Sequence, residues 1–270
     1  LKKVFAAIGV PRSRPFAPDS FQTQALAVVE HTDCLVTVPT GAGKTWIAEQ
    51  AIARIREKKD GRCWYACPLK ALSNAKYAEF SDIFGAKNVG ILTGDRKENP
   101  DAPIIVGTTE ILRNRLYDAM SRGQSLDADF VVLDEAHFLG DEDRGVVWEE
   151  IMIYLPSRIP LLMLSATIGN AEQIAAWLSS IRSKYCTVIV ETIRPVPLFP
   201  LFFHPTGTLL PLTTPVKAGV RPQLYKKVNQ FIKTSRRRNF GHSRSSPPFG
   251  DILRVLKKYD LLPAIFFLKS

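Results

Sequence analysis

The fold is decided by the stretch Val38-Pro39-Thr40-Gly41-Ala42-Gly43-Lys44-Thr45. A short run of apolar and β-branched residues leads into it at 34–38, and a helical apolar pattern continues from it through 44–58. A glycine-rich turn between a buried strand and a helix presents backbone N–H groups and a helix N-terminus to an anion. This context predicts a phosphate-binding loop, and the alternative is a glycine-rich turn without a ligand.

Each part of this loop has a predicted role in holding a nucleotide. The backbone N–H groups of 40–43 would surround phosphate oxygens, Lys44 would reach the β- and γ-phosphates, and the Thr45 hydroxyl would ligate Mg²⁺. Val38 departs from the general pattern, since a glycine or alanine is usual six positions before the lysine. The predicted ligands are therefore ATP and Mg²⁺.

Two adjacent carboxylates, Asp134 and Glu135, follow the buried apolar run at 131–133. The carboxyl ends of strands are where open α/β sheets bind their ligands. Asp134 would hold Mg²⁺, and Glu135 would orient and deprotonate the water that attacks the γ-phosphate. Alone, the pair could be an acidic turn. Together with the phosphate-binding loop it predicts an ATP hydrolase in which Lys44, Asp134 and Glu135 are catalytic.

Short apolar runs alternate with helical patterns as far as about residue 192, which is typical of βαβ units. The sequence predicts an α/β fold with a doubly wound, mostly parallel sheet. Strands are expected at 34–38, 63–67, 89–93, 103–107, 130–134, 161–165 and 187–191. Helices are expected at 44–58 and at 171–178, the second with Asn170 as its N-cap.

Prolines interrupt this pattern after Arg194, because six of them lie between 195 and 215. Beyond them we expect a helix at 222–233, a flexible basic linker at 235–250, a helix at 251–259 and a buried strand at 263–268. The predicted domains are an ATP-binding domain at 1–193, a Pro-rich extension with the basic linker at 194–250, and the truncated start of a second α/β unit at 251–270.

The net charge of +10 is distributed unevenly along the 270 residues. Residues 1–214 hold 23 of the 36 Lys and Arg and 24 of the 26 Asp and Glu, a net of −1, so 215–270 carry +11. A basic balance is usual for proteins that meet polyanions. Here the excess lies in the expected linker, whose Arg236, Arg237, Arg238 and Arg244 form either a solvated segment or a phosphate-binding arm.

The composition, with 46% hydrophobic and 23% charged residues, is that of a globular protein and excludes an intrinsically disordered chain. No apolar run is long enough for a membrane span, and the N-terminus lacks a signal peptide, so we expect a cytoplasmic or nuclear protein without a membrane partner. The four cysteines show neither metal-site spacing nor a disulfide framework and are expected to be reduced core residues.

A series of motifs then resembles one family. The motifs are Phe21-Gln22, VPTGAGKT (38–45), CPLKALSNAKYAEF (67–80), LTGD (92–95), TTEILRNRLY (108–117), DEAH (134–137), DRGVVWEE (143–150) and LSATIGNAEQ (164–173). Over about residues 10–200 the chain resembles the first RecA-like P-loop NTPase domain of superfamily-two DExH (DEAH-box) helicases, in particular the Ski-type branch with the exosome-associated RNA helicases. The resemblance resumes weakly at 194–198 and 261–270, the latter being similar to the first strand of a second RecA-like domain.

This resemblance implies further roles around the nucleotide. Gln22 would read the edge of adenine, and Phe16 would stack on its ring. Ser165 and Thr167 would couple hydrolysis to movement on the strand through His137. Judged from the residues alone, the two hydroxyls could equally cap a turn.

The resemblance also implies nucleic-acid contacts at three segments that each follow an expected strand. Their N–H groups could bind phosphate without reading sequence, and their charged side chains could equally be solvated. The predicted contact residues are Pro68, Lys70, Thr93, Gly94, Thr108, Thr109 and Arg113.

The function that these motifs imply is an ATP-dependent helicase with 3′ to 5′ movement on single-stranded nucleic acid, with RNA favoured over DNA. Alternatives are a translocase that does not separate strands and a binding module without catalysis. The family implies a monomeric motor, possible membership of a larger processing complex, and a second RecA-like domain with an arginine finger. We expect the chain alone to bind ATP, to hydrolyse it weakly and not to unwind a duplex. An iron–sulfur cluster is disfavoured, because only Cys63 and Cys67 lie between the two nucleotide motifs.

Overall fold

The structure is a computed structural model that describes residues 17–196, 198–204, 207–214, 223–238 and 248–268. The chain forms two compact units. One is Pro15–Pro195, and the other takes in Val196–Ser270.

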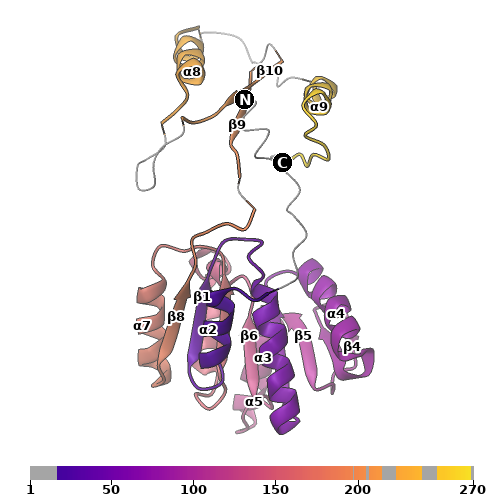
Figure 1. The fold of residues 1–270 in the computed structure, drawn as a ribbon. Coiled ribbons are helices and arrows are strands. Elements are labelled where there is room, and N and C mark those ends of the chain that lie inside the picture. Colours follow the sequence, from indigo (N-terminus) through magenta and orange to yellow (C-terminus); the bar gives the residue numbers. More distant parts are fainter. Residues whose placement is uncertain (1–16, 197, 205–206, 215–222, 239–247, 269–270) are drawn as a thin grey trace. The chain divides into compact units, whose positions relative to one another are not determined.

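The first unit is built on an eight-stranded sheet with the order β4-β3-β5-β2-β6-β7-β1-β8. Its edge strands β8 and β4 lie at opposite ends of the unit in Figure 1. All neighbouring strands are parallel except β3 and β4. The strands are β1 (Asp33–Thr37), β2 (Cys63–Cys67), β3 (Val89–Leu92), β4 (Lys97–Glu98), β5 (Ile104–Thr108), β6 (Phe130–Leu133), β7 (Leu161–Ser165) and β8 (Cys186–Val190). In the register, Val36 of β1 lies opposite Leu164 of β7 and Ile189 of β8.

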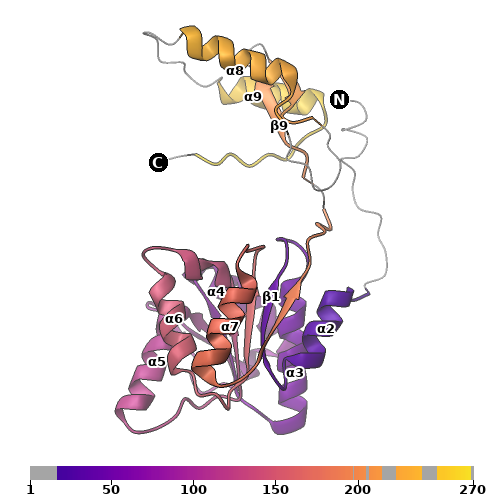
Figure 2. The same ribbon diagram turned by 90° about the vertical axis from the view of Figure 1, so that its left-hand side faces the viewer.

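Helices cover both faces of this sheet, which explains why its central strands are buried along their whole length. The helices α2 (Ser20–Val28), α3 (Lys44–Lys59) and α4 (Lys70–Phe84) pack on one face, and α5 (Thr109–Ser121), α6 (Gly145–Tyr154) and α7 (Ala171–Arg182) pack on the other. Figure 2 shows α2 and α3 on the opposite side of the sheet from α5 and α6. Two 3₁₀ turns, η1 (Ala86–Asn88) and η2 (Ala136–Gly140), lie in the connections.

The predicted doubly wound, mostly parallel fold is confirmed. Each of the seven strands expected between 34 and 191 agrees with an observed strand to within one residue at either end. The strand β4 has no counterpart among the expected strands, since two exposed residues carry no apolar pattern. Asn170 is the N-cap of α7 as predicted, although its side chain makes no capping hydrogen bond. Helix α7 continues past 178 to Arg182. The apolar pattern did not predict this end, because a charged residue does not count as part of an apolar helix face.

Arg182 ends α7 in an unusual place for a charged residue, since it is 1% exposed and pairs with a fully buried aspartate. Its Nε donates to Asp33 Oδ2 at 2.6 Å, and its other guanidinium nitrogens donate to the carbonyls of Leu155 and Ile159. Asp33 Oδ1 in turn accepts the N–H of Leu161 at 3.0 Å. This network ties α7 to the amino-terminal ends of β1 and β7.

The second unit contains an antiparallel pair of strands, β9 (Leu201–His204) and β10 (Thr208–Pro211), and two helices, α8 (Lys226–Arg238) and α9 (Phe249–Lys258). Helix α8 extends into the segment predicted to be a linker, because its lysines, arginines and glutamine are good helix formers. The predicted linker arginine Arg244 lies outside the described residues.

The expectation of a buried strand at 263–268 is wrong. These residues form no strand, and Ile265 and Phe267 are 82% and 93% exposed. An apolar run becomes a strand only beside a partner that completes its hydrogen bonds, and no described strand pairs with this one. The division of the chain at 193 and 250 stays a prediction.

No helix in the described ranges combines the length and the apolar character that a bilayer span requires. The four cysteines are unbonded and buried. Burial raises the pKa of Cys34 to about 12, so its thiol stays protonated.

Candidate active site

The order of the strands brings the nucleotide motifs together. Strands β6, β7 and β1 are neighbours, and parallel strands end at the same edge of a sheet. The phosphate-binding loop follows β1, the pair Asp134 and Glu135 follows β6, and Ser165 closes β7. Three segments that are far apart in the sequence therefore meet at one edge.

Glycines give the phosphate-binding loop its shape. Gly41 and Gly43 have φ angles of +86° and +80°, a region in which side chains are strained, and Gly43 is the N-cap of α3. Gln22 of α2 lies directly against Gly43: its Nε2 donates to the Gly43 carbonyl at 2.9 Å. The Gln22 Oε1 accepts the backbone N–H of Asp19 at 2.7 Å, which fixes the amide.

The Lys44 side chain contacts the first residue of the loop, since its Nζ donates to the Val38 carbonyl at 3.4 Å. Burial lowers the pKa of Lys44, while the negative charges of Glu135 and Asp134 act in the opposite direction. The ammonium is thus positioned near both carboxylates, at the loop where phosphates are predicted to bind.

Asp134 is 9% exposed and its two oxygens have protein partners. The Tyr65 hydroxyl donates to Oδ2 at 2.7 Å, and the Glu135 N–H donates to Oδ1 at 2.9 Å. Burial first, and then the charge of Asp134, raise the pKa of Tyr65 well above its usual value, so the phenol remains a donor. Sequence reasoning missed Tyr65, because in CWYAC it is one apolar strand residue among others.

The Thr45 hydroxyl accepts a hydrogen bond from Lys76 Nζ of α4 at 3.0 Å. Lys76 was not among the predicted site residues, although it lies within the motif at 67–80. The only available signal was its place in that motif, since 31 residues separate it from Thr45.

The donor set at this edge fits Mg²⁺. Mg²⁺ prefers oxygen ligands and takes few of them from the protein, leaving the rest to phosphates and water. A threonine hydroxyl and a carboxylate are such ligands, and Thr45 and Asp134 both act on the pKa of the same Tyr65 phenol. Within the described residues there is no cluster of three or more His, Cys, Asp or Glu that could form a separate metal centre.

Glu135 has a φ angle of +53°, which is strained for a residue other than glycine. Its carboxylate lies beside His137, since 3.1 Å separates Glu135 Oε2 from His137 Nδ1. Strained residues that the surrounding structure holds in place are concentrated at functional sites.

The segment after β7 is fixed by Thr37, the last residue of β1. The Thr37 hydroxyl donates to the Ala166 carbonyl at 3.0 Å and accepts the Ile168 N–H at 3.1 Å. The Ser165 hydroxyl is buried and has no hydrogen-bond partner among the described residues, and Thr167 is exposed. Ser165 is therefore free to gain a partner without losing one.

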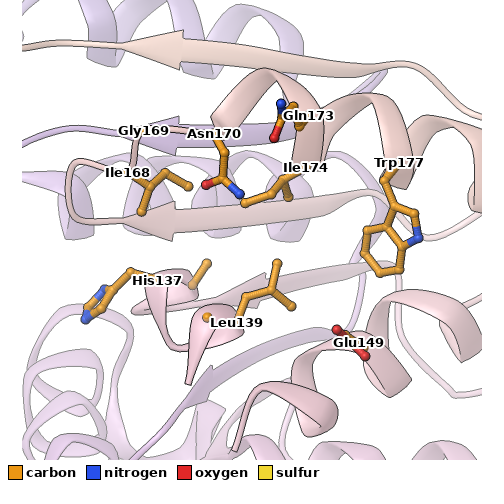
Figure 3. Close-up of a pocket in the computed structure, with 11 residues that line it drawn as sticks. His137, Leu139, Glu149, Ile168, Gly169, Asn170, Gln173, Ile174 and Trp177 are labelled. Atoms are coloured by element: carbon orange, nitrogen blue, oxygen red, sulfur yellow. The ribbon is translucent and has the colours of Figure 1, made fainter. Parts of the chain in front are cut away.

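A cavity of about 480 Å³ adjoins these coupling segments. It lies between η2 and the start of α7, and Figure 3 shows His137 at one end and Trp177 at the other. Its wall is formed by Ala136, His137, Leu139, Gly140, Glu149, Ile168, Gly169, Asn170, Gln173, Ile174 and Trp177.

The predicted nucleic-acid segments share the other half of the edge, because β3, β5 and β2 are also neighbours. Lys70 Nζ lies 3.2 Å from Asp95 Oδ1, which joins the segment after β2 to the segment containing Thr93 and Gly94. The Pro68 carbonyl accepts from Arg144 at 3.2 Å, a contact that sequence reasoning missed.

In the third predicted nucleic-acid segment, the two threonine side chains are not exposed. Thr108 and Thr109 are buried, and Thr108 is the N-cap of α5. Arg113 Nη1 lies 3.4 Å from Glu150 Oε2 of α6. Phe16, predicted to stack on adenine, lies outside the described residues.

Changing Gly43 to alanine should weaken nucleotide binding at least about tenfold and cost about 1–2 kcal/mol of stability. A Cβ at Gly43 would lie 2.9 Å from Gln22 Nε2 at a positive φ, so the loop and the glutamine must both shift. Binding of a fluorescent nucleotide and urea unfolding measure the two effects. Gly123→Ala is the control, since its φ is +63° but its Cβ would meet nothing within 4 Å. Equal nucleotide affinities in both variants would contradict the expectation.

Comparison with known proteins identifies the family of the chain. The family model for the DEAD/DEAH box helicase matches residues 19–174. The chain is 36% identical over 281 residues to the probable helicase HelY of Mycobacterium leprae, covering 95% of this chain and 29% of HelY. It is 46% identical over 202 residues to the chloroplastic DExH-box ATP-dependent RNA helicase DExH15 of Arabidopsis thaliana, with shares of 73% and 17%. Over 184 residues it is 44% identical to Superkiller complex protein 2 of Homo sapiens, with shares of 68% and 14%.

A solved structure of similar fold is the DUF1998 helicase MrfA bound to DNA, with a TM-score of 0.53 and 17% identity over 70% of this chain and 29% of that one. The chain thus spans less than a third of the length of the relatives named here. The family resemblance that the motifs predicted, including its Ski-type branch, is confirmed. With its phosphate-binding loop, its Asp-Glu-Ala-His segment and its RecA-like sheet in one unit, this chain belongs to the DEAD/DEAH box helicase family and carries the ATP-dependent motor domain of that family.

Proposed function

We propose that Pro15–Pro195 binds and hydrolyses ATP to drive 3′ to 5′ movement on single-stranded RNA. The observation that carries the proposal is the adjacency of β6, β7 and β1, which gathers the phosphate-binding loop, the carboxylate pair and Ser165 at one edge. The same edge continues into β2, β5 and β3, whose ends carry the proposed nucleic-acid segments.

The proposed chemistry follows from the contacts. The N–H groups at 40–43 and the Lys44 ammonium bind the phosphates, and Gln22 recognises adenine beside them. Thr45 and Asp134 would hold Mg²⁺, which would supply neutralisation of the phosphate charge when bound. Tyr65 keeps Asp134 in place through its 2.7 Å hydrogen bond.

Glu135 is the proposed general base. It takes a proton from the attacking water, and His137 holds one of its oxygens in position at 3.1 Å. His137 lies on η2, and Ser165 has an unused hydroxyl at the end of the neighbouring strand. The coupling role proposed for the three residues is that a movement of His137 during hydrolysis changes the hydrogen bonds of Ser165 and Thr167.

RNA is the proposed substrate because one relative is described as an RNA helicase. The similar structure bound to DNA keeps DNA as the alternative. The name of the human relative supports a role within a larger complex, and we propose a monomeric motor of the cytoplasm or nucleus within it.

Single-stranded RNA should stimulate ATP turnover of the full-length protein several-fold more than DNA of the same length and sequence. The physical reason is that contacts to the sugar can distinguish the 2′-hydroxyl, whereas phosphate contacts alone cannot. Steady-state ATPase assays with both strands measure this. Greater stimulation by DNA would show that DNA, and not RNA, is the substrate. Displacement of a labelled strand separates a helicase from a translocase.

A further inference from the structure

Lys76 has two partners of different kinds. Its Nζ donates to the Thr45 hydroxyl at 3.0 Å and to Glu79 Oε2 at 2.6 Å. Its side chain is 18% exposed. A lysine this far from water needs compensation for its charge, and Glu79, one turn further along α4, provides it.

The contact with Thr45 conflicts with the proposed metal site. A hydroxyl oxygen has two lone pairs, and in this structure one of them accepts from an ammonium group. A divalent cation at the same oxygen would place two positive charges around a single atom, in a partly buried site where charges are poorly screened. Lys76 and Mg²⁺ therefore compete for Thr45.

Glu79 is a second partner onto which the Lys76 ammonium can move. It already binds Lys76, so leaving Thr45 does not leave the charge unpaired. Glu49 of α3 faces the same group: burial first, and then the negative charge of Glu79, raise the pKa of Glu49, while Lys76 lowers it. Two carboxylates, Glu79 and Glu49, thus interact with the Lys76 ammonium in addition to the Thr45 hydroxyl.

We propose that Lys76 is a positioning residue that holds the Thr45 hydroxyl while the nucleotide site is empty and moves fully onto Glu79 when Mg²⁺ and nucleotide bind. The proposal rests on the proposed ATP site. Lys76 and Lys70 belong to the same helix, and the Lys70 ammonium pairs with Asp95 in the proposed nucleic-acid half of the edge. The exchange at Lys76 thereby connects occupancy of the metal site with the helix that begins at the proposed nucleic-acid contacts.

The test is the Mg²⁺ dependence of nucleotide binding by the full chain, followed with a fluorescent ADP analogue. Lys76→Met should lower the half-saturating Mg²⁺ concentration roughly three- to tenfold, because it removes the competing charge. Glu79→Gln should raise it, because the ammonium then has no anionic alternative on its helix. Lys87→Met, an exposed lysine on η1, is the matched control and should leave it unchanged.

The possible results distinguish a failure of the inference about Lys76 from a failure of the proposed ATP site. If the unaltered chain binds the analogue and Lys76→Met has the same Mg²⁺ dependence, the inference about Lys76 is wrong and the ATP site stands. If Glu79→Gln shifts the dependence in the same direction as Lys76→Met, the exchange between Thr45 and Glu79 is wrong. If the unaltered chain binds no nucleotide at any Mg²⁺ concentration, the proposed site fails, and the inference fails with it.

Discussion

Replacing Glu135 with glutamine is expected to reduce ATP turnover of the full-length protein by roughly 10²–10⁴-fold while nucleotide binding persists. Glutamine keeps the size of the side chain but cannot take a proton from water. The backbone at Glu135, with φ at +53°, makes hydrogen bonds through its N–H to Asp134 Oδ1 and through its carbonyl from the Phe138 N–H, and the substitution leaves both in place, so the geometry should survive the change.

The measurement pairs steady-state turnover with equilibrium binding of a fluorescent nucleotide. Glu142→Gln is the control, because Glu142 is exposed and lies two residues beyond η2. This substitution removes the same charge without touching the site. Turnover that survives in Glu135→Gln would show that another group is the general base.

Replacing Arg182 with methionine should destabilise the first unit by about 3–5 kcal/mol. The change leaves the Asp33 carboxylate fully buried, with the Lys184 ammonium at 3.7 Å as its remaining cationic neighbour. It also removes the donors to Leu155 and Ile159, whose carbonyls then lack those partners. Urea unfolding measures the loss.

A surface ion pair of equal length provides the control. Arg62 and Asp127 are also 2.6 Å apart, but Asp127 is 78% exposed, so Asp127→Asn should change stability by no more than about 1 kcal/mol. Adding Asp33→Asn to Arg182→Met should recover part of the loss, since the amide oxygen still accepts from Leu161 and no charge is left buried. Similar losses for Arg182→Met and Asp127→Asn would contradict the importance of burial.

The sheet and its nucleotide edge could be predicted because local patterns specify them. Buried parallel strands are continuous apolar runs, and the phosphate-binding loop combines glycines, a lysine and a threonine in one short stretch. The strand at 263–268 shows the limit of the same rule. Its apolar pattern predicts a strand, but strand formation depends on a partner elsewhere in the chain.

The contacts that hold the site could not be predicted in this way. Tyr65 meets Asp134 across 69 positions of sequence, and Arg182 meets Asp33 across 149. Each residue read alone has an ordinary explanation, as an apolar strand residue or as a surface charge. Only the order of the strands and the packing of α7 on the sheet show that they are neighbours, and neither is encoded in any local period.

Strand β2 has a mechanical consequence, because it separates the two halves of the active edge. It pairs with β5 on the proposed nucleic-acid side and with β6 on the proposed nucleotide side, both through parallel ladders of several residues. Sliding one half past the other would break a whole ladder of backbone hydrogen bonds at once. The sheet should therefore resist sliding between its two halves, and the proposed coupling between nucleotide and nucleic-acid contacts would act through the loops and side chains at its edge.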